Sequence, residues 1–184
     1  MDKEVIKPTE NGRLMAGYCI SFETMKMFGT LNESETLQEM ITLFSTSQEF
    51  SDIQLRVSEK RALNALNASK THSTIRFPLS GKIKSGSMKV NCLIQAQLGC
   101  LPVTDFPLVQ DTAKIFRIGL RLVKCYSDLQ RSKKTLSSVL TALLLVQCFK
   151  AKLWENSLYV SRQLENIGEC SIMLQLFTAS LMTF

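Results

Sequence analysis

Residues 110–129, QDTAKIFRIGLRLVKCYSDL, restrict the fold of this chain more than any other stretch. At 100° per residue, four cations of this stretch fall within an arc of about 80° of a helix, and apolar side chains fill most of the remaining circumference. An ordinary surface helix has a broad polar face and a narrower apolar one. We therefore expect other elements to surround this helix on every side but one. The four cations are Lys114, Arg117, Arg121 and Lys124.

Short amphipathic segments precede this helix. We expect helices over residues 12–20, 22–30, 35–47 and 59–69, because apolar side chains recur there at helical spacing. Residues that favour helix starts stand before or at the beginning of them: Pro8, Thr9, Asn11, Ser21, Ser34 and Ser58.

The helical pattern stops over residues 69–88, SKTHSTIRFPLSGKIKSGSM. Pro78, Gly81 and Gly86 stand among several Ser and Thr residues, which is typical of an irregular segment. We interpret it as a basic connector that can lie along a groove, or whose FxLxGxIK fragment forms a brief hairpin.

Helical patterns return over residues 89–100, over the long helix at 108–130, and over 135–154 and 157–168. The run at 140–146 is so apolar that we expect it at the centre of the core. Because strand signals are few, the predicted fold is all-α, a helical bundle around the long helix. The expected organisation is short N-terminal helices (1–68), the basic connector (69–88), the bundle (89–168) and a divergent apolar tail (169–184).

The tail, ECSIMLQLFTASLMTF, has one charged residue and no strict period. It can form a buried helix, a short membrane-associating segment or an unnatural terminus produced by truncation or alternative splicing, and we favour the last. No apolar run is long enough to span a bilayer, so we expect no membrane partner.

The charge is unevenly distributed along the sequence. Residues 1–59 hold ten acids and five bases, residues 60–104 hold seven bases and no acid, and residues 105–184 hold ten bases and six acids. A basic remainder after an acidic first third indicates a surface that faces a polyanion, or a hydrated basic face with no partner.

The sequence lacks the motifs of the main enzyme classes. There is no phosphate-binding loop, no G-x-G-x-x-G and no acidic pair that would hold Mg²⁺ beside a nucleotide. The six cysteines are scattered without a C-x-x-C pair, and the single His72 lies in the connector, so we expect no metal site, no catalytic residue and no cofactor in this chain. We interpret the cysteines as reduced core residues of an intracellular protein.

The cationic strip is the remaining candidate for function. Its cations recur every three to four residues, so that one stands on every turn, about 5 Å from the next. This spacing suits a helix that lies along a single nucleic-acid strand and contacts successive phosphates. The alternative is a hydrated face whose cations pair with acids of the N-terminal third.

Several strings resemble the Sec63-type helical domain of superfamily-two nucleic-acid helicases, most closely that of meiotic crossover-promoting ATP-dependent DNA helicases. ENGRLMAGYCISFETMKMF is similar to a G-R-x-x-A-x-Y-x-I-x-x-x-T pattern, and VNCLIQAQLG to N-x-L-L-Q-A-H-L. The long helix and KAKLWENSLYVSRQLENIG follow in the family's order, so that the resemblance covers about residues 8–168.

The resemblance implies an accessory domain in the nucleus, packed beside two ATPase domains and a winged helix that are absent here. Its long helix would contact the translocating single-stranded DNA, and Lys114, Arg117, Arg121 and Lys124 are the matching contact candidates. ATP and Mg²⁺ would be used by the missing domains, so we expect a fragment or truncated isoform without helicase activity of its own. The alternatives are an all-α protein-interaction module and, more remotely, a membrane-peripheral protein that uses the apolar tail.

Overall fold

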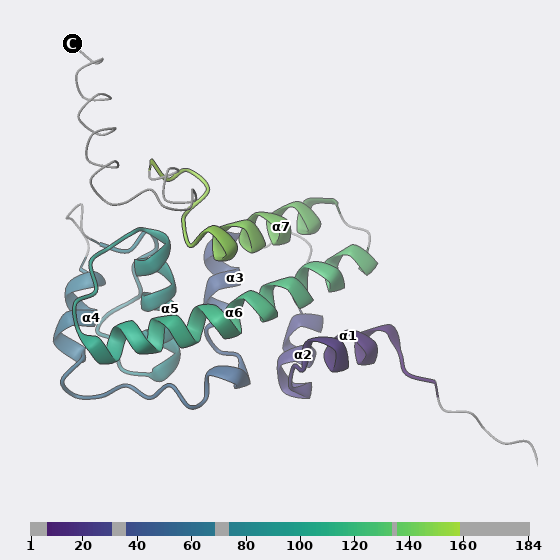
Figure 1. Ribbon diagram of the computed structural model, residues 1–184, viewed down its shortest axis with the longest axis horizontal. Helices are drawn as coiled ribbons and strands as arrows, with labels where there is room; N and C mark the ends of the chain where they lie inside the picture. The colour runs from purple at the N-terminus through teal and green to yellow at the C-terminus, as the bar shows by residue number, and fades with distance from the viewer. Residues whose placement is uncertain (1–6, 31–35, 69–73, 134–135, 159–184) are drawn as a thin grey trace, which may run out of the picture.

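The chain folds as a bundle of helices around α6 (Figure 1), and the all-α prediction is confirmed. The computed structural model describes residues 7–30, 36–68, 74–133 and 136–158, and no strand occurs within these ranges. The elements are α1 (Glu10–Tyr18), α2 (Phe22–Gly29), α3 (Leu37–Phe44), the 3₁₀ turn η1 (Gln48–Phe50), α4 (Lys60–Leu66), α5 (Gly86–Leu98), α6 (Phe106–Lys133) and α7 (Leu136–Ala151). The predicted helix at 157–168 falls mostly, and the tail at 169–184 wholly, outside the described residues.

Side-chain caps begin most of the helices. Thr9 and Ser21 accept hydrogen bonds from backbone N–H groups of α1 and α2, as their positions in the sequence indicate. Thr36 and Glu39 form a reciprocal capping box at the start of α3, two residues after Ser34, which lies outside the described residues. Ser58 is not the cap of α4, because that position is taken by Glu59.

Three aromatic rings join the N-terminal helices to α6. Phe28 of α2, Phe44 of α3 and Tyr126 of α6 pack edge to face, with centroid distances of 5.1 to 5.5 Å. All three rings are almost completely buried. Edge-to-face pairs add to the stability that burial of the rings already provides, so this triad fixes α6 against the first helices.

The described part of the connector forms no hairpin, so that alternative is wrong. It is an irregular segment whose backbone hydrogen-bonds to side-chain amides of α5 and of the α4 end. Gln95 exchanges two hydrogen bonds with the backbone of Phe77, at 2.7 and 3.0 Å. Asn67 exchanges two with Leu79, at 2.7 and 3.0 Å. The helix α5 begins at Gly86, so the connector ends before residue 88.

The apolar helix α7 lies at the edge of the bundle (Figure 1), and the prediction that its run at 140–146 is central is wrong in part. Ala142 and Leu145 are buried, but Leu140 and Leu143 are about half exposed. The buried face of α7 packs against α6 at Gly119. A Cβ atom on Gly119 would lie 2.5 Å from the ring of Phe149 in α7. Gly119 therefore allows the two helices to approach each other closely.

Candidate nucleic-acid interface

The long helix α6 is enclosed on all sides but one, as the proportions of its apolar and charged faces predict. It contacts α1, α3, α5 and α7, and Figure 1 shows it running through the middle of the bundle. Its exposed positions recur every three or four residues along one line. We call this line the open stripe of α6; it consists of the exposed Gln110, Ala113, Arg117, Arg121, Lys124 and Arg131 and the half-buried Asp128.

Three of the four predicted cations lie on the open stripe. Arg117, Arg121 and Lys124 are exposed, and none of them forms an ion pair with another described residue. Lys114 lies at the border of the stripe, with 37% of its side chain exposed, and its Nζ is 3.5 Å from the Asp52 carboxylate. An ion pair between exposed side chains is weak, so Lys114 remains accessible to a stronger anionic partner.

The open stripe ends at an anchored carboxylate. Tyr18 of α1 donates a 2.6 Å hydrogen bond to Asp128 Oδ2, and Arg131 lies 3.4 Å from Oδ1 of the same residue. The hydrogen bond to Asp128, together with burial and the negative charge, raises the pKa of Tyr18 to about 12. Asp128 therefore attaches α1 to α6, and it lies one to three turns beyond the cations Arg117, Arg121 and Lys124.

A buried charge cluster holds the other end of α6, and the sequence analysis did not identify it. Lys89 of α5 is completely buried and donates to Glu59 at 2.6 Å and to Asp111 of α6 at 2.7 Å. Its third hydrogen bond goes to the carbonyl of Gln54 at 3.1 Å. Burial favours the neutral form of Glu59, but hydrogen bonds from Lys89 and Arg56 outweigh it and hold the pKa of that carboxyl below its usual value.

Two cations of the acid-free stretch at 60–104 are engaged by acids from other parts of the chain. Lys89 is buried in the cluster just described, and Arg76 pairs with Glu155 at 2.7 Å while it stacks over the rings of Phe77 and Trp154. The other described cations of this stretch are all exposed: Lys60, Arg61, Lys82 and Lys84. Pairs that are distant in sequence therefore neutralise part of the apparent charge.

The described residues contain no group of three or more His, Cys, Asp or Glu side chains that could hold a metal ion. None of the described helices combines the length and apolarity needed to cross a bilayer. His72 lies outside the described residues. Burial raises the pKa of the Cys92 thiol to about 12 and those of Cys125 and Cys148 to about 11, so these three thiols are unreactive core groups.

The chain matches the family model for the Sec63 Brl domain over residues 8–183, a range that includes most of the apolar tail. It is 53% identical over its whole length to the probable ATP-dependent DNA helicase HFM1 of Xenopus tropicalis, of which it covers 14%. It is 56% identical to human HFM1, with 91% of the chain and 12% of that protein aligned. It is 33% identical to the ATP-dependent DNA helicase MER3 of Saccharomyces cerevisiae, with 90% of the chain and 15% of that protein aligned.

The chain spans less than a sixth of the length of these curated relatives. Their aligned part lies over the same bundle that carries the open stripe. The all-helical fold, the segments GRLMAGYCI and VNCLIQAQLG, and the family match agree with one another. This chain belongs to the Sec63 Brl domain family.

Proposed function

We propose that this chain is a non-catalytic accessory domain of an ATP-dependent DNA helicase of meiotic recombination, and that it binds single-stranded DNA along the open stripe of α6 in the nucleus. The similarity to the ATP-dependent DNA helicases HFM1 and MER3 supports the helicase assignment. Two ATPase domains would use ATP and Mg²⁺, and these domains and a winged helix would pack beside this bundle. Lys114, Arg117, Arg121 and Lys124 would contact phosphates.

The proposal rests on one observation: the cations in the middle of the stripe are not neutralised by acidic side chains in the part of the chain that the structure describes. Arg117, Arg121 and Lys124 have no acidic partner among the described residues, although the chain holds sixteen Asp and Glu. At 1.5 Å per residue, Arg117 and Lys124 are separated by about 10 Å along the axis. Cations spaced in this way along a rigid rod can follow the phosphates of an extended strand without reading its bases.

Salt-dependent binding of a fluorescent single-stranded oligonucleotide tests this proposal. If four phosphates are contacted, the logarithm of the affinity should fall with the logarithm of the salt concentration at a slope of about −3. Arg117→Ala combined with Arg121→Ala should weaken binding of every base sequence alike and make the slope shallower by about 1.4.

The matched control is Lys82→Ala combined with Lys84→Ala, which removes the same charge from exposed positions off the stripe. This control should retain most of the affinity and nearly the whole slope. Equal losses in the two double variants would show that net charge, and not the stripe, determines binding.

A protein-interaction module without nucleic-acid binding is the second candidate. It is favoured by the outer face of α7, where Leu136, Leu140 and Leu143 are exposed at helical spacing. The same titration separates the two functions, because this candidate predicts no oligonucleotide binding at low salt.

A further inference from the structure

A small apolar pocket opens beside the cationic part of the open stripe. It has a volume of about 280 Å³ and lies between α6, the last turn of α5 and the residue that follows the end of α7. Val109, Ala113 and Phe116 of α6 form its apolar wall. Gln97 and Lys152 contribute polar groups from the other two elements.

The pocket adjoins the stripe directly. Ala113 belongs to both, and Arg117 follows Phe116 in the chain. Lys152 is exposed and forms no ion pair with a described residue, and the Gln97 amide makes no hydrogen bond to one. The pocket is therefore lined by the largely buried ring of Phe116 and by the Gln97 amide. One uncompensated cation, Lys152, lines it, and a second, Arg117, lies on the adjoining stripe.

We infer that this pocket holds one nucleobase of a single strand bound on the stripe, an inference that rests on the proposed function. The base would lie against Phe116, and Arg117 and Lys152 would contact the phosphates on either side of its nucleotide. An amide both donates and accepts hydrogen bonds, so Gln97 can pair with the edge of any base. The volume lies just below the range of drug-sized ligand sites, about 300 to 1,000 Å³, and suits a single planar base.

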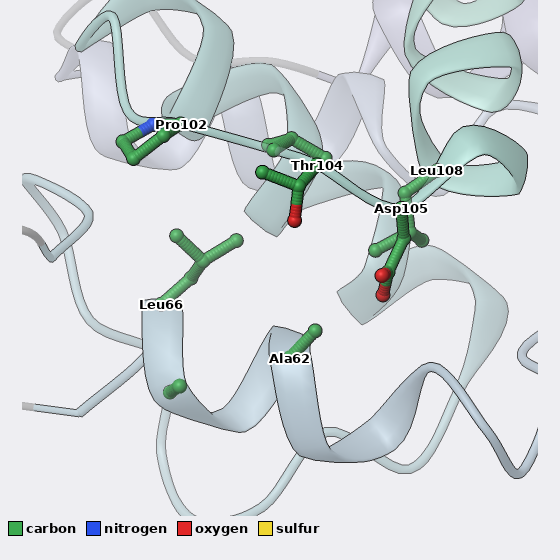
Figure 2. Close-up of a pocket in the computed structure, with 8 residues that line it drawn as sticks. Ala62, Leu66, Pro102, Thr104, Asp105 and Leu108 are labelled. Atoms are coloured by element: carbon green, nitrogen blue, oxygen red, sulfur yellow. The ribbon is translucent and has the colours of Figure 1, made fainter.

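A second pocket lies nearby, and the charges at its rim make it a poorer site for a nucleotide. It has about 400 Å³ and lies between α4 and residues 102–108, with Leu66 and Ala62 facing Thr104 and Asp105 (Figure 2). Val103 lines both pockets. The rim of this second pocket carries the Asp105 carboxylate and no lysine or arginine, so it would repel a phosphate chain. It provides a matched control.

The test compares two oligonucleotides of equal length, one of thymidines and one of abasic sugar phosphates. A base held against an aromatic ring contributes about 1–3 kcal/mol, so the native chain should bind the thymidine strand at least about five-fold more tightly. Gln97→Phe fills the pocket from the α5 side and should reduce this preference to about one-fold without changing the affinity for the abasic strand. Ala62→Phe fills the control pocket and should behave as the native chain.

Each result decides between the two ideas. Equal binding of both strands by the native chain would overturn the base pocket and leave phosphate binding intact, whereas no binding of either strand would refute the proposed function itself. An unchanged preference in Gln97→Phe would also overturn the pocket. If circular dichroism shows Gln97→Phe to be unfolded, Gln97→Leu replaces it: it should reduce the preference, and if it does not, the base does not occupy this pocket. Lys152→Gln removes a phosphate contact and should weaken the binding of both strands alike; an unchanged affinity for both would also overturn the assignment.

Discussion

Replacing Lys89 by methionine should destabilise the bundle more than any substitution of an exposed lysine. Methionine preserves most of the side-chain volume but leaves Glu59, whose side chain is 4% exposed, without its buried cation. Breaking a buried ion pair on one side costs about 3–5 kcal/mol, against a total of about 5–15 kcal/mol for a typical domain. Arg56 remains near Glu59, but its side chain is more than half exposed and cannot fill the space that Lys89 leaves.

Urea unfolding followed by circular dichroism measures this loss. With an unfolding slope of about 2 kcal/mol per molar urea, the midpoint should fall by about 2 M at pH 7. Lys82→Met, at an exposed position, is the control and should shift the midpoint little. Combining Lys89→Met with Glu59→Gln should recover part of the loss, because the uncompensated carboxylate is then gone.

The pH dependence separates a charge effect from a packing effect. In the native chain the pKa of Glu59 is held low, so the stability it confers is present at neutral pH and is lost as the pH falls through that lowered value. In Lys89→Met, burial without the lysine should raise the pKa of Glu59, so the difference in stability between variant and native chain should shrink as the pH falls from 7 towards 4. A difference that stays constant over this range would refute the electrostatic explanation.

Three further predictions follow from other contacts. Tyr18→Phe removes the hydrogen bond to Asp128 and should cost about 1.5–3 kcal/mol at pH 7, measured by urea unfolding. Because the pKa of Tyr18 is raised from 10 to about 12, this contribution should be complete up to pH 10 and be lost progressively as the pH rises towards 12. Gly86→Ala would place a Cβ atom 2.5 Å from the carbonyl oxygen of Ile53 and should lower stability by about 1–3 kcal/mol, whereas an unchanged melting temperature would contradict that close approach. Iodoacetamide at pH 8 should modify the exposed Cys19 much faster than the buried thiols, and mass spectrometry of the native chain that finds equal rates would contradict the burial of Cys92, Cys125 and Cys148.

The helices could be predicted from the sequence because their evidence is local. The period of Phe22, Met25 and Phe28 identifies α2, and the narrow arc of cations identifies the open side of α6. The connector could not be predicted in this way, since its backbone is satisfied by Asn67 and Gln95, which reach it from other elements. Hydrogen bonds of this kind leave no periodic pattern in the segment that receives them.

The errors concern residues whose surroundings are set by distant parts of the chain. An apolar run such as that of α7 does not reveal which of its faces is covered, so Leu140 was expected inside the core and lies half exposed. A count of charges treats Lys89 as part of a surface, although in the folded chain it begins an unbroken run of buried residues that continues to Ala96. The candidate pocket was missed because Gln97, Phe116 and Lys152 meet only in the folded bundle.

The stripe can attract a phosphate chain only if the carboxylates of α6 do not neutralise its cations. This helix has only two carboxylates, and each is bound to a partner outside the cationic part: Asp111 to Lys89 of α5, and Asp128 to Tyr18 of α1. The same contacts that attach α6 at both ends therefore remove its negative charges from the neighbourhood of Arg117 and Arg121. Because no acid of α6 is left to neutralise these arginines, the attraction between the stripe and a phosphate chain is determined by the contacts that build the bundle.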